Sequence, residues 1–194
     1  GARAGILFRN AESIERMRDI DTVIVDKTGT LTLGHPALTD FVAEGIPENE
    51  ALALVAGVEQ LSEHPIGSAI VEGAKKRGLT PRPAGAFNAV NGLGVRADID
   101  GKRVLVGSRV FLSRNGVDTK RWEERAESWR SEAKTVVFFA VDGKAAGLAA
   151  VADPVKESTP EAIAALKRSH VRIVMLTGDS QRTAEAVARR LGID

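Results

Sequence analysis

The chain has 194 residues, of which 43% are hydrophobic and only 4% aromatic, so it can bury one good core or two small ones built from aliphatic side chains. Its 27 Lys and Arg residues nearly balance its 26 Asp and Glu residues, which excludes the basic excess of a nucleic-acid-binding protein and predicts no nucleic-acid partner. The absence of cysteine excludes disulfides and thiolate metal sites, and it is consistent with a reducing cytosol.

The first half of the chain alternates between regular segments and Gly or Pro breaks. In chain order, the expected elements are a surface helix over 10–18, a buried strand over 22–26, a strand over 37–42, and helices over 47–59 and 65–77. The Gly-His-Pro sequence at 34–36 disfavours any regular element and therefore predicts a boundary after the first strand.

The next section has the period of β-strands. Apolar and polar residues alternate over 95–106 around Asp100-Gly101, which predicts a hairpin. Two apolar runs, 136–141 and 145–151, are joined by Asp142-Gly143 and predict a second hairpin. Helices are expected over 108–114 and 121–131. Helices packed on an antiparallel sheet make this part α+β.

The last section alternates helix, strand and helix, over 159–169, 171–177 and 182–191. This order predicts a parallel sheet that also contains the strand at 22–26. The predicted fold class is therefore α/β, with an α+β domain inserted into a parallel α/β domain. No apolar stretch approaches the roughly 18 residues of a membrane-spanning helix, so we expect a soluble piece without a membrane segment or signal peptide.

The segment Asp26-Lys27-Thr28-Gly29-Thr30-Leu31-Thr32 directly follows the strand at 22–25. Ligands of an open α/β sheet bind beyond the carboxyl ends of its parallel strands, where side chains and turn amides converge. The Asp26 carboxylate would there attack the terminal phosphate of a nucleotide and form an aspartyl-phosphate. For a bare Asp-x-Thr, an ordinary turn after a strand is the structural alternative.

These seven residues resemble the phosphorylation signature of the P-type ATPases, and four further segments resemble motifs of that family in the same order. They are Ser62-Glu63-His64-Pro65, Asn91-Gly92-Leu93-Gly94-Val95, Asp153-Pro154-Val155-Lys156 and Met175-Leu176-Thr177-Gly178-Asp179. The first two resemble the nucleotide site of the heavy-metal-transporting branch, the third its hinge, and the fourth its phosphate-binding loop. The N-terminal segment 5–12 also resembles the corresponding segment of bacterial copper(I) exporters.

The resemblance implies a haloacid-dehalogenase-like phosphorylation domain, formed by 1–34 and 153–194, with a nucleotide-binding domain at 35–152. It implies ATP and Mg²⁺ as cofactors, in a pump that exports heavy-metal cations, Cu(I) first, at the cytoplasmic face of the cell membrane. The pump's transmembrane and actuator domains would be partners. Because the family's phosphorylation domain continues beyond a Thr-Gly-Asp loop, we expect a truncated domain that cannot complete the cycle, with an open strand edge that favours self-association.

The resemblance assigns the catalytic and metal-binding roles around the first motif. Asp26 is the nucleophile, and Asp26 with the backbone carbonyl of Thr28 would ligate Mg²⁺, which prefers oxygen donors. Related phosphohydrolases carry an acid at position 28 that speeds breakdown of the phospho-enzyme, so a threonine there implies a longer-lived intermediate. The Lys27 side chain either steadies the phosphate or points to solvent.

The second phosphate-binding segment is Thr177-Gly178-Asp179. The Thr177 hydroxyl and the Gly178 amide would hold phosphate oxygens beside Asp179, as fixed donors aimed where charge develops. Thr-Gly-Asp is also a common turn between a strand and a helix, which is the structural alternative here.

The nucleotide site implied by the resemblance comprises Glu63, His64, Gly92, Gly94 and Ser108. The Glu63 carboxylate would accept a hydrogen bond from the exocyclic amine of adenine, and the His64 ring would orient the purine. Gly92 and Gly94 would let the backbone approach the nucleotide and adopt a positive φ. Ser108 stands where the family usually has Asn, so a hydroxyl would replace an amide contact.

Two other functions remain open from the sequence. A stand-alone phosphohydrolase of the haloacid dehalogenase type would need a second carboxylate at position 28, which is Thr28 in this chain. A regulatory module that binds ATP or ADP without catalysis is the other alternative. Steady phosphate release would favour the first alternative, and tight binding without turnover would favour the second.

Overall fold

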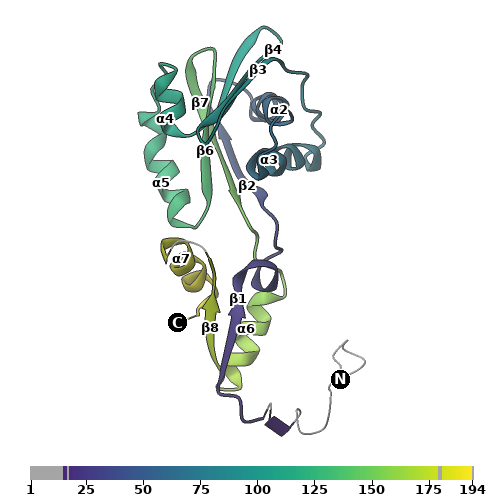
Figure 1. Cartoon of the computed structure of the whole chain (residues 1–194), viewed down its shortest axis with the longest axis vertical. Coiled ribbons are helices and arrows are strands. Elements are labelled where there is room, and N and C mark those ends of the chain that lie inside the picture. The colour runs from purple at the N-terminus through teal and green to yellow at the C-terminus, as the bar shows by residue number, and fades with distance from the viewer. Residues whose placement is uncertain (1–14, 17, 179–180, 194) are drawn as a thin grey trace.

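The computed structural model describes residues 15–16, 18–178 and 181–193. Figure 1 shows two units stacked along the long axis of the molecule, a larger one containing β2 to β7 and a smaller one containing β1, β8, α6 and α7. The helix predicted over 10–18 lies mostly outside the described residues. Within the described residues, no helix is both long enough and apolar enough to span a membrane.

The elements of the structure follow the predicted order closely. In chain order they are β1 (Thr22–Asp26), β2 (Ala37–Ala43), α2 (Glu48–Glu59), α3 (Pro65–Lys76), β3 (Gly85–Val90), β4 (Gly94–Ile99), β5 (Lys102–Gly107), α4 (Arg109–Arg114), α5 (Glu123–Ser131), β6 (Thr135–Val141), β7 (Lys144–Ala152), α6 (Thr159–Arg168), β8 (Arg172–Leu176) and α7 (Gln181–Leu191). Short helical turns also occur at Lys27–Leu31 and Lys120–Trp122.

The larger unit is an antiparallel six-stranded sheet in the order β2-β7-β6-β5-β4-β3. Helices α2 and α3 pack on one face, and α4 and α5 on the other, as Figure 1 shows. Each face has its own aliphatic core: Leu52, Ile70 and Val104 are fully buried on the first, and Leu112 and Leu148 on the second. Both predicted hairpins are confirmed, as is the α+β character of this unit.

Strand β3 was not predicted. Its residues are almost all exposed, so they carry no alternation of apolar and polar side chains that a sequence pattern could reveal. Its pairing with β4 is irregular between Gly85 and Asn88, where Ala86 has a φ of 48°. This edge strand is therefore held mainly by its pairing with β4, and of its residues only Phe87, which is half-buried, packs against the core.

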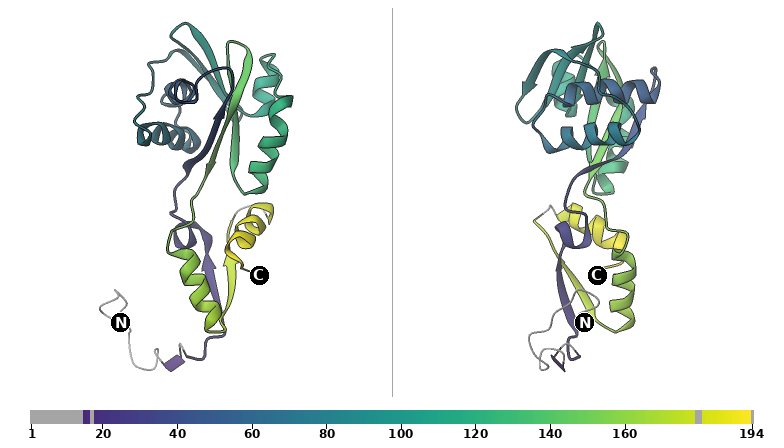
Figure 2. Two further views of the ribbon diagram at one scale, coloured as in Figure 1. Left: turned by 180° about the vertical axis from the view of Figure 1, so that it is seen from behind. Right: turned by 90° about the vertical axis from the view of Figure 1, so that its right-hand side faces the viewer.

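The smaller unit contains the predicted parallel pair, with β1 and β8 in register from Thr22 opposite Arg172 to Asp26 opposite Leu176. One face of this pair packs against α6 and α7, which lie on the same side of the strands in Figure 2. The prediction that β1 is a buried strand is wrong, because the opposite face carries no helix among the described residues: Ile24 is 67% exposed and Leu176 62%.

The parallel pair inside the smaller unit and the antiparallel insert together confirm the predicted α/β fold class. Strands β2 and β7 leave the insert side by side, with Ala37 opposite Ala152, and each continues into a linker to the smaller unit. Domain boundaries at 34/35 and 152/153 stay a prediction. Among the described residues, β1 and β8 pair only with each other, and self-association through their outer edges likewise stays a prediction.

Candidate functional site

The predicted phosphoryl-transfer residues lie at the carboxyl ends of β1 and β8. Asp26 is the last residue of β1 and is exposed. Its register partner is Leu176, the last residue of β8, so Thr177 and Gly178 follow at the same edge of the sheet. The structure therefore brings Asp26, Thr177 and Gly178 together, whereas Asp179 lies outside the described residues.

The chain turns sharply after Asp26. Thr28 has φ −77° and ψ 123°, and Gly29 has φ 76° and ψ −14°, which are the dihedrals of the two central positions of a type II turn. Such a turn needs a residue that tolerates positive φ at its second central position, and this explains Gly29. The Lys27 side chain is 8% exposed, so it is buried and the alternative that it points to solvent is wrong.

The turn is held by the linker that returns from β7. The Asp153 carboxylate accepts hydrogen bonds from the Thr32 hydroxyl at 2.6 Å and from the Gly34 amide at 2.9 Å. The Thr32 oxygen in turn accepts from the Gly29 amide at 3.3 Å and lies 3.0 Å from the Lys27 carbonyl oxygen. Asp153 is thus linked to the turn that follows the nucleophile through one buried hydroxyl group.

Further contacts join the turn after Asp26 to the linker that follows β7. The Lys156 ammonium donates to the Gly29 carbonyl at 2.5 Å, and the Thr159 hydroxyl donates to the Leu31 carbonyl at 2.8 Å. Thr32 and Val155 form an isolated antiparallel bridge. Sequence reasoning predicted a hinge at 153–156 but missed that its side chains bind the phosphorylation motif, because the partners are more than 100 positions apart in the chain.

The Ser62-Glu63-His64-Pro65 segment forms the entrance of α3. Pro65 occupies the first helical turn, as predicted, and His64 is the N-cap, whose Nδ1 accepts a hydrogen bond from the Ile66 amide at 3.2 Å. Because the neutral imidazole accepts through Nδ1, its Nε2 carries the proton and can donate to a ligand. Glu63 and His64 are both exposed, so both are accessible to a nucleotide.

A buried acid lies beneath this segment. Glu59, the last residue of α2, is 6% exposed, and burial raises the pKa of its carboxyl from 4.5 to about 7, with the Ser62 hydrogen bond opposing the rise. Its Oε2 lies 2.5 Å from the position that a Cβ on Gly67 would take, so the glycine of α3 makes room for the acid. Sequence reasoning missed Glu59 as a site residue, although its helical spacing with the buried Leu52 and Val55 indicated an inward-facing acid.

The two predicted nucleotide-site glycines differ in conformation. Gly92 has φ 70°, and a Cβ on it would contact nothing within 4 Å, as expected for an open turn. The prediction of a positive φ is wrong for Gly94, which is a regular residue of β4 opposite Gly107. Gly94 is required by packing: a Cβ there would lie 2.6 Å from a ring carbon of Phe111 and 2.8 Å from the Gly107 Cα.

We therefore expect Gly94→Ala to destabilise the fold even without nucleotide. The added methyl group has no space between two backbones and a buried ring, and such overpacking costs roughly 1–3 kcal/mol. Urea unfolding measures the loss. Gly85→Ala is the matched control, because Gly85 is a strand residue without positive φ whose Cβ would meet only the Asp98 carbonyl oxygen at 3.8 Å, an ordinary contact. Equal losses in the two variants would contradict the packing argument.

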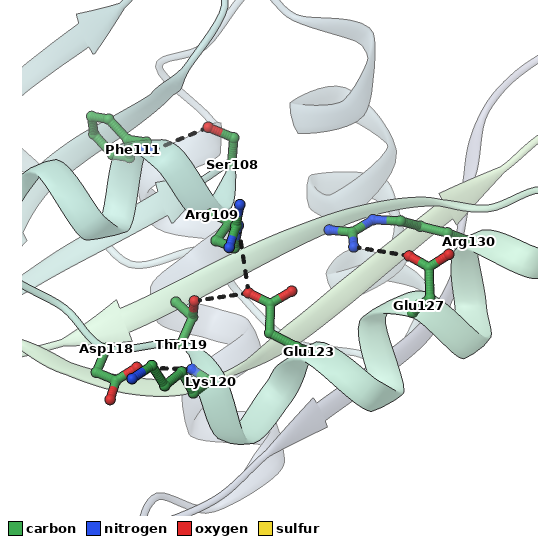
Figure 3. A network of polar contacts seen from close by, with 9 residues as sticks. All are labelled: Ser108, Arg109, Phe111, Asp118, Thr119, Lys120, Glu123, Glu127 and Arg130. Atoms are coloured by element: carbon green, nitrogen blue, oxygen red, sulfur yellow. Dashed lines mark hydrogen bonds and ion pairs between the residues drawn. The ribbon is translucent and has the colours of Figure 1, made fainter.

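Ser108 is positioned as the N-cap of α4, where its Oγ accepts a hydrogen bond from the Phe111 amide at 3.2 Å. The hydroxyl can still donate one hydrogen bond, so the predicted contact to a nucleotide remains chemically available. Figure 3 shows the neighbouring network, in which Glu123 of α5 contacts both Arg109, at 3.7 Å, and Thr119, at 3.2 Å. These contacts tie the start of α4 to α5.

The described residues contain no cluster of three or more His, Asp or Glu side chains that could enclose a metal ion. Magnesium does not need one, since it usually keeps several waters and binds through one or two carboxylates and the phosphates of its substrate. An exposed Asp26 carboxylate next to the Thr28 backbone fits that sparse set of oxygen ligands.

A model of the family described as haloacid dehalogenase-like hydrolase matches residues 20–194, and the chain belongs to this family. Over its whole length it is 49% identical to a copper-exporting P-type ATPase of Legionella pneumophila and 45% identical to a silver exporting P-type ATPase of Salmonella typhimurium, covering 26% and 24% of them. The chain thus spans about a quarter of the length of these relatives.

Solved structures agree with these sequence matches. A zinc-transporting PIB-type ATPase in the E2.Pi state superposes with a TM-score of 0.89 at 33% identity, covering all of this chain and 31% of that one. The N-domain of HMA6, a copper-transporting P-type ATPase, superposes with a TM-score of 0.52 at 31% identity, covering 61% of this chain and 99% of that one.

Proposed function

We propose that this chain is the ATP-binding and phosphorylation region of a membrane pump that exports heavy-metal cations, with Cu(I) as the first candidate. One observation carries the proposal: Asp26 lies beside Thr177 and Gly178 at the carboxyl edge of a parallel pair, in a chain similar along its whole length to copper- and silver-exporting P-type ATPases. In such a pump the chain works at the cytoplasmic face of the membrane, with transmembrane and actuator domains as its partners.

In the proposed reaction, a carboxylate oxygen of Asp26 attacks the γ-phosphorus of ATP. The new bond joins Asp26 Oδ to phosphorus, the bond from phosphorus to the β–γ bridging oxygen breaks, and ADP leaves with that oxygen. Thr177 and Gly178 donate hydrogen bonds to the phosphoryl oxygens at the edge where Asp26 ends. Attack by water on phosphorus later releases phosphate and restores the Asp26 carboxylate.

Two features of the chain bear on the binding of Mg²⁺ and on the lifetime of the phospho-enzyme. Asp26 and the Thr28 carbonyl would hold Mg²⁺, which when bound offsets the charge repulsion between the carboxylate and the phosphates. The residue at position 28 is a threonine, which cannot deprotonate the attacking water as a carboxylate does. A long-lived phospho-enzyme suits a pump and disfavours the alternative of a stand-alone phosphohydrolase.

We propose that the adenine of ATP binds at the entrance of α3, near Glu63, His64, Gly92, Gly94 and Ser108. Glu59 joins this set because its carboxyl lies at the same entrance, against Gly67 of α3 and hydrogen-bonded to Ser62, where a carboxyl oxygen can accept from an exocyclic amine.

Calorimetric titration of ATP and ADP against the whole chain tests the nucleotide site. We expect His64→Ala to weaken binding by about tenfold or less, because one lost polar contact is worth roughly 1 kcal/mol. His170→Asn is the matched control: His170 is an exposed histidine of the smaller unit with φ 58°, a conformation that asparagine tolerates. Unchanged affinity in His64→Ala, or equal weakening in both variants, would contradict the site.

A further inference from the structure

We propose that Asn91 is a site of spontaneous covalent modification, at which the side-chain amide is lost and an isoaspartate forms in the turn between β3 and β4. The chain contains two Asn-Gly pairs, Asn91-Gly92 and Asn115-Gly116, and only the first leaves both reacting groups without a hydrogen bond. The modification follows from the geometry of the turn. Its effect on ATP binding rests on the proposed function, because the turn belongs to the proposed nucleotide site.

The reaction joins the side chain of an asparagine to the backbone nitrogen of the next residue. The Gly92 nitrogen attacks Asn91 Cγ, the bond from Cγ to Nδ2 breaks, and ammonia leaves with the proton that the Gly92 nitrogen gives up through solvent. The product is a five-membered succinimide ring. Water then opens the ring: attack on the former main-chain carbonyl carbon gives isoaspartate, and attack on Cγ gives aspartate. Water is the only co-reactant, and nothing is oxidised or reduced.

Asn91 and Gly92 are the two central residues of an exposed turn. The Leu93 amide donates to the Val90 carbonyl at 3.0 Å and closes the turn around them. Among the residues that the structure describes, neither the Asn91 side chain nor the Gly92 amide has a hydrogen-bond partner. Gly92 has no side chain to hinder the approach of its nitrogen, and the space where a Cβ would lie is empty to 4 Å. The two groups can therefore meet without the loss of any hydrogen bond.

The same two groups are held in the second pair. The Asn115 Nδ2 donates to the Phe111 carbonyl at 2.8 Å, and the Gly116 amide donates to the Ser113 carbonyl at 3.0 Å. Attack at Asn115 requires both bonds to break first, which opens the end of α4. The glycines of the two pairs have similar φ values, 70° for Gly92 and 77° for Gly116, and both asparagines are exposed. Asn115 is thus an internal control that differs in its hydrogen bonds.

Isoaspartate changes the turn that carries Gly92. The backbone then runs through the former side-chain carbons, which adds one atom to the turn between Val90 and Leu93, and a carboxylate replaces a neutral amide. The new negative charge repels the phosphates of a nucleotide bound nearby. We therefore expect the modified chain to bind ATP at least about fivefold more weakly, since the loss of one polar contact already has an effect of this order.

Peptide mass spectrometry of the whole chain, aged in a mildly alkaline buffer, tests the modification. We expect the peptide that contains Asn91 to gain about 1 Da and to become a substrate for an isoaspartyl methyltransferase, as this type of covalent change requires. The peptide that contains Asn115 is expected to stay unmodified over the time in which half of Asn91 reacts. An unmodified Asn91, or conversion of Asn115 at the same rate, would overturn the assignment.

Calorimetric titration of ATP against fresh and aged protein tests the effect on binding. Ion exchange separates the aged molecules that have gained a negative charge. We expect these molecules to bind ATP more weakly than fresh wild type, and Asn115→Gln to lose affinity on ageing as the wild type does. Asn91→Gln is expected to have the same affinity before and after ageing, because its longer side chain would have to close a six-membered ring, which forms far more slowly.

The two measurements separate this inference from the proposed function. If converted wild type binds ATP as tightly as fresh wild type, or if Asn91→Gln loses affinity equally on ageing, the effect of isoaspartate on the nucleotide site is overturned while that site stands. If fresh wild type does not bind ATP, the proposed function fails and the effect on binding fails with it. The mass measurement then still decides, by itself, whether Asn91 is the modified residue.

Discussion

Glu59→Gln is expected to make the chain more stable than the wild type above pH 7, and equally stable near pH 4. Burial raises the pKa of Glu59 from 4.5 to about 7 in the folded chain, so between these values the unfolded chain releases a proton that the folded chain retains. The free energy of unfolding therefore falls as pH rises through this window and levels off above pH 7. A glutamine has no proton to release, so its stability shows no such fall.

The size of the change in unfolding free energy follows from the linkage between proton binding by Glu59 and folding. A pKa that rises from 4.5 to about 7 corresponds to a loss of at most about 3 kcal/mol of stability across the window, which is a large part of the stability of a small domain. Urea unfolding at several pH values between 4 and 8 measures it. Glu72→Gln on α3 is the control, because Glu72 is exposed. Parallel pH profiles for wild type and Glu59→Gln would show that the acid is not held in a desolvated place.

The hairpins were predictable because two local signals agree. Asp100 and Gly101 have φ values of 50° and 76°, and Asp142 and Gly143 of 49° and 78°, as the two-residue turns encoded by Asp-Gly require. The alternating or apolar flanks then fix which residues face the core. Strand β3 lacked the alternation, since it is exposed, although the Asn91-Gly92 turn that joins it to β4 is a hairpin signal that sequence reasoning did not use.

The neighbourhood of Asp26 was predictable for a topological reason. Once strands 22–26 and 171–177 are assigned to one parallel sheet, their carboxyl ends must share an edge, and Asp26 and Thr177 come together without any knowledge of tertiary packing. The exposure of β1 could not be predicted this way. A run of β-branched residues indicates a strand, but the number of faces that helices cover depends on elements elsewhere in the chain.

The contacts that hold the turn were not predictable from local patterns. Thr32 and Asp153 are separated by 121 positions, and their hydrogen bond depends on the two linkers running side by side out of the insert. The burial of Glu59 similarly depends on a glycine of another helix, Gly67, which leaves space for the carboxyl. Sequence periodicity gave the direction of the side chain, and only the packing of α2 against α3 gave its environment.

Replacement of Asp26 is expected to have the largest effect on function. The amide oxygen of an asparagine is neutral and a poor nucleophile, so Asp26→Asn removes the carboxylate that forms the proposed bond to phosphorus. We expect phosphoryl transfer to be lost completely, while ATP still binds, because Asp26 lies in the smaller unit and the proposed adenine site lies in the insert.

Labelling with γ-³²P-ATP and Mg²⁺, followed by an acid quench, tests this central claim most directly, in the full-length membrane pump that the proposed function requires. Asp21→Asn is the matched control, since Asp21 is an exposed acid that precedes β1. We predict an acid-stable, hydroxylamine-sensitive label in the wild type and in Asp21→Asn, and none in Asp26→Asn. A label that persists in Asp26→Asn, or one that resists hydroxylamine in the wild type, would show that Asp26 is not the phosphoryl acceptor.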